Sequence, residues 1–170
     1  MSDKAKKIFL IITVVVPFLI YCIVYYRPIL KNAPFRSDEF VSIQYKWGTG
    51  KELVNQYDSA TGAYQYLNEK DSLIKTNVKL RKDDIIYLHN KASVIGFWNF
   101  PEVIANRGTD VSKTTALRYE LQFNYKRTSK KVIYLSNYEE IPKLRDLAVQ
   151  MKTLVEQTIN DAEDRYTKKN

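Results

Sequence analysis

The stretch Ile8–Tyr26, which reads IFLIITVVVPFLIYCIVYY, constrains this chain most, because it contains no charged side chain. A helix rises about 1.5 Å per residue, so these 19 residues would extend about 28 Å, close to the hydrocarbon thickness of a bilayer. The sequence after Tyr26 is polar and rich in turn signals. We therefore predict a short basic tail (1–7), a transmembrane helix (8–26) and a separate folded part.

Two other interpretations of this apolar stretch fit less well. A cleaved signal peptide has an apolar core of about 7–15 residues and small residues at its cleavage site. Here the run is longer, and Tyr25 and Tyr26 stand where small residues are expected. Lipidation of Cys22 stays an alternative, which the bulky Tyr21 before it disfavours. We predict a retained helix anchored between Ile8 and Tyr26.

The orientation of this span depends on its flanking charges and on the length of its tail. The basic residues nearly balance across the span, with Lys4, Lys6 and Lys7 before it and Arg27, Lys31 and Arg36 after it. Basic residues near the ends of a span set its topology, so the balance leaves the direction open. A seven-residue tail is typical of a signal anchor. We therefore expect a single-pass membrane protein with a cytoplasmic N-terminus and an extracytoplasmic C-terminal domain.

The segment after the span divides into a linker and one domain. Residues 27–38 contain Pro28 and Pro34 and no amphipathic period, which predicts a stiff juxtamembrane linker. Residues 39–165 are enough for one domain with a core. The acidic residues Asp161, Glu163 and Asp164 lie near the end of the last predicted helix, which is unfavourable for anions, so fraying is expected there and in residues 166–170. The only cysteine lies in the apolar stretch, so the domain depends on its hydrophobic core alone.

Alternation and helical periodicity predict the order of elements in this domain. Strands are expected at 40–47, 63–67, 72–80, 117–125 and 132–135, with at most one more short strand in the ambiguous passage 53–60. Helices are expected from the acidic pair Asp83-Asp84 to a stop at Gly96, and from about Ile141 to Ile159. Residues 102–113 are predicted to be a loop. This order, β-β-β-α-β-β-α, indicates an α+β fold in which both helices pack on one face of an antiparallel sheet of about five strands.

The sequence contains no recognisable catalytic constellation. His89 is the only histidine, and it follows Leu88 on the first predicted helix, where a structural role is expected. The pairs Asp83-Asp84 and Glu139-Glu140 are explained as helix starts. The segment Trp47–Lys51 lacks the spacing of a phosphate loop. We therefore predict no catalytic residues, no metal site and no cofactor.

Aromatic residues are the remaining candidates for a binding surface. The chain has 13 Tyr, 7 Phe and 2 Trp, and those on the 117–125 strand share a face with its leucines, so they are assigned to the core. Five others are less constrained and are the candidate binding residues: Trp47, Tyr57, Tyr64, Tyr66 and Trp98.

These observations favour a non-catalytic, membrane-anchored interaction domain that faces away from the cytoplasm. It would be an accessory subunit, an assembly factor or an inhibitor-like or immunity-like binder, with the lipid bilayer and a protein as its partners. The formal charge is +8, and residues 1–26 hold three lysines and one aspartate, so an excess of +6 falls on the rest. Because these charges are scattered, we assign them to solubility and expect neither nucleic acid nor a metal as a partner. The alternatives are an enzyme whose carboxylate or hydroxyl groups meet only in the fold, and a cytoplasmic basic domain on anionic lipid or nucleic acid.

Overall fold

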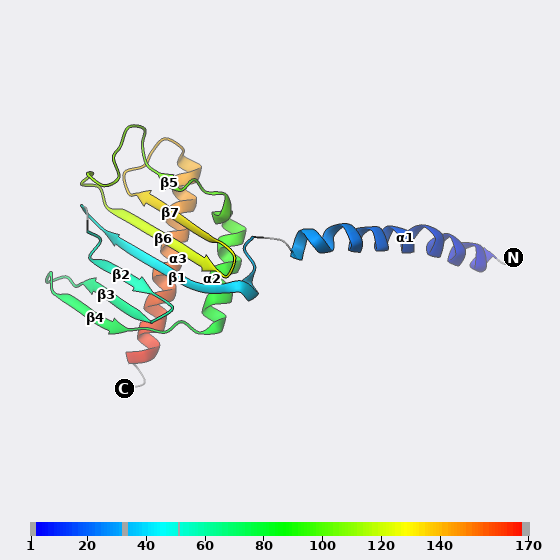
Figure 1. Ribbon diagram of the computed structural model, residues 1–170, viewed down its shortest axis with the longest axis horizontal. Helices are drawn as coiled ribbons and strands as arrows, with labels where there is room; N and C mark the ends of the chain where they lie inside the picture. Colours follow the sequence, from blue (N-terminus) through cyan, green and yellow to red (C-terminus); the bar gives the residue numbers. More distant parts are fainter. Residues whose placement is uncertain (1–2, 32–33, 51, 168–170) are drawn as a thin grey trace. The chain divides into compact units, whose positions relative to one another are not determined.

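The computed structural model describes residues 3–31, 34–50 and 52–167, and the chain divides into two units, Met1–Pro34 and Phe35–Asn170 (Figure 1). Helix α1 (Asp3–Lys31) makes up the first unit. Its segment Asp3–Tyr26 is long and apolar enough to cross a membrane, and none of that segment is buried against protein. A signal sequence near an N-terminus has the same properties, so length and composition show a candidate span.

The polar side chain of Thr13, within the apolar segment of α1, forms its hydrogen bond inside the helix. The Thr13 hydroxyl donates a hydrogen bond to the Phe9 carbonyl at 2.8 Å, which suits an apolar surrounding. The rings of Tyr21 and Tyr25 stack at 5.7 Å near the far end. The helix continues through Pro17 and past Tyr26 to Lys31, into the segment predicted to be linker. The linker residues 32–33 lie outside the described part of the chain.

The second unit is one mixed sheet with two helices behind it. The strands are β1 (Phe40–Gly48), β2 (Asn55–Asp58), β3 (Ala63–Leu67), β4 (Leu73–Asn77), β5 (Val103–Ile104), β6 (Arg118–Tyr125) and β7 (Ser129–Leu135). The helices are α2 (Lys82–Ile95) and α3 (Pro142–Thr167), with short 3₁₀ helices η1 (Ser37–Glu39) and η2 (Phe97–Asn99). The strand order is β4-β3-β2-β1-β6-β7-β5, and every pairing is antiparallel except β5 with β7. Figure 1 shows α2 and α3 on the same face of this sheet.

The α+β class is confirmed, but the predicted number of about five strands is wrong, because the sheet has seven. One missed strand is β5, which lies in the segment predicted to be a loop and pairs in parallel with β7. A strand of two residues is too short to show a periodicity. It is recognised only by its pairing with β7, in which Val103 lies opposite Ile133, 30 residues later. The ambiguous passage also contains a full strand, β2, between β1 and β3.

Strand ends differ from the alternation in three places. β4 ends at Asn77, although Val78 keeps the inward direction of the pattern and is fully buried. β7 begins at Ser129, within the predicted turn. Val41 is 53% exposed because a register shift between Phe40 and Ser42 inserts a bulge in β1.

The core lies between the sheet and the two helices, as the periodicities predict. On β6, Leu121, Phe123 and Tyr125 are buried. Helix α2 buries Leu88, Ala92 and Ile95 and ends at Gly96, whose φ of 81° is the left-handed conformation that glycine adopts freely. Helix α3 contributes a stripe of buried residues at helical spacing: Ala148, Met151, Val155, Ile159 and Ala162.

The C-terminal end of α3 is held by side chains from elsewhere in the fold. Arg165 Nη2 lies 2.5 Å from Asp84 Oδ2 on α2, and the Tyr66 hydroxyl donates to Glu163 Oε1 at 3.3 Å. These contacts extend the helix to Thr167, past the acidic residues that predicted fraying and into the predicted frayed end 166–170. Residues 168–170 lie outside the described part of the chain.

Candidate functional site

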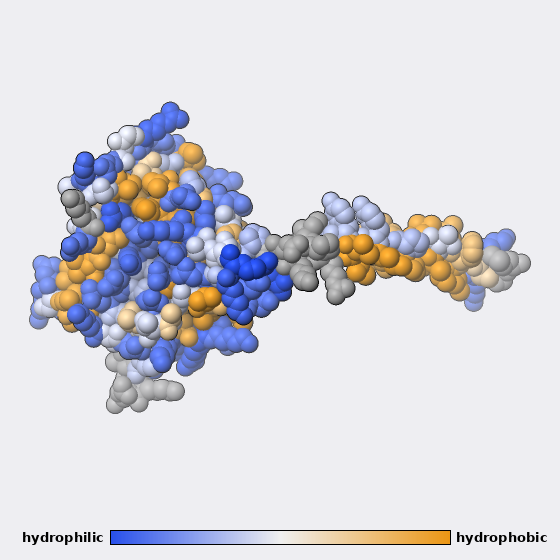
Figure 2. All heavy atoms as spheres, in the orientation of Figure 1, coloured by the Kyte–Doolittle hydropathy of each residue, from blue (hydrophilic) through white to orange (hydrophobic). Residues whose placement is uncertain are grey.

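The sheet has one face covered by α2 and α3 and one polar face that we call the open face. The residues of the open face alternate with the core residues along each strand. Figure 2 shows a mostly hydrophilic band across the middle of this face, with apolar surface at its margins. The helices occupy the other face, so this is the broad surface that the sheet presents to solvent.

One row of side chains crosses four strands of the open face. The strand registers place Lys46 opposite Gln56, Gln56 opposite Gln65, and Gln65 opposite Lys75. Neighbouring strands lie about 4.8 Å apart, so the two lysine Cα atoms are about 14 Å apart. We call this set Lys46–Gln56–Gln65–Lys75 the polar row. The row lines a hollow of about 310 Å³ together with residues from the flanking rows.

Two carboxylates of the open face are held by neighbouring groups, Glu120 by cationic side chains and Asp58 by neutral hydrogen-bond donors. Glu120 is held by Arg118 at 3.4 Å and by Lys131 at 2.7 Å. Asp58 accepts a hydrogen bond from the Gln44 amide at 3.1 Å and from the backbone N–H of Ala60 at 2.8 Å.

The two lysines of the polar row are in a different position from these paired charges. Lys46 and Lys75 are exposed, and no carboxylate within the described residues approaches either ammonium group within 4.0 Å. The hollow therefore presents two ammonium groups, amide groups and the single carboxylate of Asp58 to a ligand, a net charge that is still positive.

Apolar side chains adjoin the hollow at the end of strands β2, β3 and β4. Leu67 and Leu73 face each other across the β3–β4 pair and are 40% and 45% exposed. Val54 is 38% exposed, and its carbonyl accepts a hydrogen bond from the Gln65 amide, which places it beside β3. Figure 2 shows this apolar surface at the left margin of the open face. Exposed apolar surface next to polar groups is typical of interaction sites.

The covered face contains the most strongly perturbed titratable groups. The Tyr45 hydroxyl donates to Glu156 Oε1 at 2.6 Å, and Lys152 Nζ lies 2.9 Å from Glu156 Oε2 and 4.8 Å from the centre of the Tyr119 ring. Burial first, and then the Glu156 charge, raise the pKa of Tyr45 far above its ordinary value. Burial opposes the charged form of Lys152, but the hydrogen bond and charge of Glu156 outweigh it and raise its pKa.

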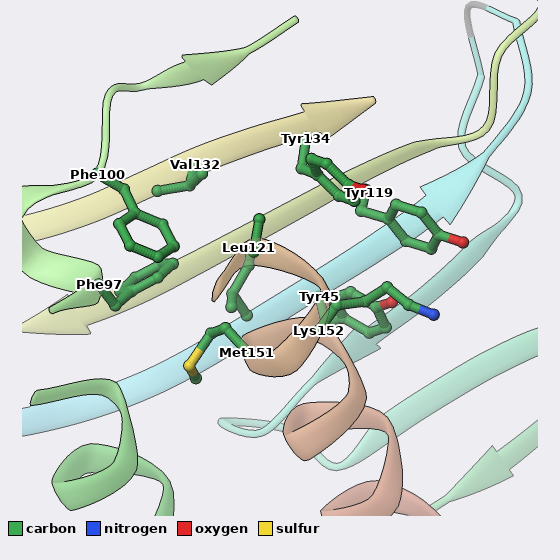
Figure 3. Close-up of a pocket in the computed structure, with 10 residues that line it drawn as sticks. Tyr45, Phe97, Phe100, Tyr119, Leu121, Val132, Tyr134, Met151 and Lys152 are labelled. Carbon is green, nitrogen blue, oxygen red and sulfur yellow. The ribbon is translucent and has the colours of Figure 1, made fainter. Parts of the chain in front are cut away.

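The space beside this network is too small for a substrate. Figure 3 shows Tyr45, Tyr119, Leu121 and Met151 converging from the sheet and α3 on a cavity of about 20 Å³. A space of this size accommodates about one water molecule. We therefore interpret the Tyr45–Glu156–Lys152 network as a structural link between β1 and α3.

The structure distributes the five predicted aromatic binding residues over the core and its margin. Tyr57 and Tyr64 are buried, with 1% and 7% exposure, and the Tyr57 hydroxyl donates to the Val78 carbonyl. Trp47 and Tyr66 are half-buried on the covered face, where Trp47 stacks on Tyr45 at 4.9 Å. Trp98 is also half-buried.

Trp98 belongs to an aromatic cluster that packs the end of α2 against the sheet. It stacks on Phe35 at 4.5 Å and meets Phe123 edge-on at 5.3 Å. Of the five predicted residues, Trp47, Tyr66 and Trp98 thus keep part of their surface accessible. Their assignment as binding residues stays a prediction.

The single histidine lies in the same aromatic cluster. His89 Nδ1 is 2.7 Å from the Tyr125 hydroxyl, and its ring lies 5.7 Å from that of Trp98. Burial lowers the pKa of His89. Within residues 3–31, 34–50 and 52–167, no three His, Cys, Asp or Glu side chains come together in a way that would hold a metal ion.

Comparison of the chain with protein-family models, with curated proteins and with solved structures found no match. The candidate site therefore rests on its own geometry. Alternation along the strands predicts a polar face, and it assigns Gln44 and Lys46 to that face because they alternate with Ile43, Tyr45 and Trp47. The alignment of Lys46 with Lys75 was missed, because strand register depends on turns and bulges that no single strand reveals.

Proposed function

We propose that this protein is a non-catalytic, single-pass membrane protein whose folded domain binds a protein partner on the open face of its sheet. The hollow lined by the polar row carries this proposal, because it presents Lys46 and Lys75 without carboxylate partners among the described residues. An accessory subunit, an assembly factor and an inhibitor-like or immunity-like binder would all act in this way.

The chemistry of the open face favours a protein over a small molecule. Sites for small molecules are enclosed and mostly apolar, with a few fixed polar groups. The polar row instead consists of long lysine and glutamine side chains, of which Lys46, Gln56 and Lys75 are exposed and Gln65 is half-buried. The apolar residues Val54, Leu67 and Leu73 beside it add the mixture of apolar and polar surface that protein interfaces show.

The anchor defines where this binding would take place. A helix such as Asp3–Tyr26, with no buried surface and no charged residue after Lys7, gains stability by lying in lipid. A tethered domain meets membrane-bound partners at high effective concentration, so modest affinity is enough. We propose that the domain lies outside the cytoplasm.

Cysteine accessibility tests the orientation. A Cys22→Ser chain that also carries Ala60→Cys, an exposed turn position, is treated with a membrane-impermeant maleimide in intact cells. We expect labelling of Ala60→Cys, and labelling of a Lys4→Cys control only after permeabilisation. The opposite pattern would place the domain in the cytoplasm and contradict the orientation.

Site-specific photo-crosslinking tests the binding surface. A photoreactive amino acid replaces Gln56 on the open face, or Val149, which is 40% exposed on α3, as the matched control. We expect one discrete protein adduct from position 56 that is lost when Lys46→Glu and Lys75→Glu are added, and no such adduct from position 149. Equal adducts from both positions, or none from position 56, would refute the open face as the binding surface.

A further inference from the structure

Strand β4 is the outermost strand of the sheet and pairs only with β3. Its hydrogen-bonding direction follows from two bonds at its ends: the N–H of Asn68 donates to the carbonyl of Ser72 at 3.0 Å, and that of Val78 donates to the carbonyl of Gly62 at 2.7 Å. Bonded and non-bonded pairs alternate in an antiparallel ladder. The residues that lie between these, Leu73, Lys75 and Asn77, therefore direct their N–H and C=O groups away from the sheet.

This edge is long enough to template another strand. β5, at the opposite edge, has two residues, whereas β4 has five in regular register with β3. Within the sheet, no described strand other than β3 pairs with β4. Proteins usually blunt such edges with proline, bulges or charged side chains. Here one charged side chain, Lys75, stands at the middle of the strand.

We propose that the free edge of β4 accepts an extended segment of the partner protein as an eighth strand. In this arrangement an acidic residue of the partner lies opposite Lys75, and an apolar residue two positions away lies opposite Leu73. The inference rests on the proposed function and names how the partner is recognised. Backbone hydrogen bonds would supply affinity, and the alternating side chains would supply specificity.

The charge and polarity of the residues around β4 favour such an acidic, partly apolar segment. Residues 68–82, which contain β4 and its flanks, carry five basic and two acidic side chains. Leu73 and Lys75 both project onto the open face, because they are two positions apart in one strand. The apolar residue of the partner would extend the surface of Leu67 and Leu73, and its carboxylate would neutralise a lysine that has no acidic partner among the described residues.

A second copy of this chain fits the same edge poorly. Two-fold dimers pair their edge strands antiparallel and in symmetric register. A pairing that used all of β4, from Leu73 to Asn77, would place the central Lys75 of one copy opposite Lys75 of the other. Like charges directly opposite each other destabilise a strand pair. The edge is therefore suited to a different chain of opposite charge.

Two synthetic peptides test this inference against the full-length protein in detergent micelles. One is fluorescein-labelled acetyl-STVTETVTS-amide, in which valines flank the glutamate at two positions in either strand direction, and the other has lysine in place of that glutamate. Fluorescence anisotropy measures the dissociation constants. We expect the glutamate peptide to bind about tenfold more tightly, since the pair with Lys75 changes from attractive to repulsive.

Three variants separate strand addition from general attraction to a basic surface. Lys75→Glu should reverse the peptide preference, whereas Lys143→Glu, at an exposed lysine on α3 outside the open face, should leave it nearly unchanged. Leu73→Pro removes an outward N–H at the first residue of the strand, where proline is tolerated, and should weaken binding of the glutamate peptide by about tenfold or more.

Three results would overturn the inference: no saturation by the glutamate peptide below about 1 mM, equal binding of the two peptides, or equal loss of glutamate-peptide binding in Lys75→Glu and Lys143→Glu. Suppose that one of these results is found and position 56 still gives its discrete adduct in the chain that keeps Lys46 and Lys75. The β4 edge is then rejected, and the open face remains the proposed binding surface. Absence of an adduct from position 56 in the chain that keeps Lys46 and Lys75, together with intact peptide binding, would reject the proposed surface and retain the edge.

Discussion

The hydroxyl of Tyr45 is expected to contribute measurably to the stability of the domain. Tyr45 is 1% exposed, and its hydroxyl donates to Glu156 across the interface between β1 and α3 at 2.6 Å. A tyrosine hydroxyl is protonated at neutral pH, and burial raises the pKa of Tyr45 further, so the donor is retained into the alkaline range. Tyr45→Phe removes the donor and leaves the ring in place.

The loss of unfolding free energy expected for Tyr45→Phe depends on how exposed the acceptor, Glu156, is. A hydrogen bond to a charged group contributes about 1.5–3 kcal/mol. The Glu156 side chain is 30% exposed and keeps its ion pair with Lys152, so water compensates part of the loss. We expect Tyr45→Phe to lower the free energy of unfolding by about 1–2 kcal/mol. For a domain of this size that corresponds to a fall in Tm of about 4 °C for each kcal/mol.

Urea unfolding of the full-length protein in a mild detergent, followed by tryptophan fluorescence, measures this loss. A double-mutant cycle with Glu156→Ala should give a coupling energy of about 1 kcal/mol or more, because the two groups are in direct contact. The matched control is Tyr87→Phe, at a ring that is 45% exposed on α2, which should change stability by less than about 0.5 kcal/mol. The structural interpretation would be refuted by equal effects of the two Tyr→Phe changes, or by an additive cycle.

Two further predictions concern a turn and the histidine. Gly62→Ala should destabilise the domain by about 1–3 kcal/mol in urea unfolding, because φ is +77° and the new Cβ would lie 2.8 Å from Asn77 Oδ1. The control is Gly50→Ala, which has the same φ but open space around the new Cβ and should therefore destabilise the domain less. Equal losses in the two variants would contradict the predicted clash. Burial lowers the pKa of His89, so the unfolded chain binds the proton first as the pH falls. The stability that neutral His89 contributes is therefore complete above about pH 6.5 and is lost as the pH falls through the folded-state pKa. Melting curves between about pH 7.5 and about pH 5 should show a steeper loss in the natural chain than in His89→Gln, and parallel curves would show that His89 does not cause it.

Local signals predicted the helices of the domain well. Acidic side chains near the N-terminus of a helix are stabilised by the positive end of its dipole, and a residue in the left-handed conformation commonly ends a helix. Asp83-Asp84 and Gly96 satisfy both conditions within the sequence itself. The end of α3 was different. Its acidic residues predicted fraying, yet contacts of Glu163 with Tyr66 and of Arg165 with Asp84 hold the helix to Thr167.

The candidate site shows why pairing could not be predicted in the same way. Each strand of the open face displays its polar side by alternation, so the existence of a polar face was predictable. The row that joins Lys46 to Lys75 depends on three successive registers, and a one-residue slip in any of them would turn a lysine toward the core.

The sequence by itself determined the features that depend on the partition of side chains between water and an apolar environment. These are the apolar helix Asp3–Tyr26, the α+β class and the two faces of strands such as β6. Only the tertiary structure decided which strands are neighbours, that β5 joins the sheet in parallel, and that β4 is left with a free edge. The physical reason is that hydrophobic periodicity is a property of one segment, whereas register and edges are set by contacts between segments far apart in the chain.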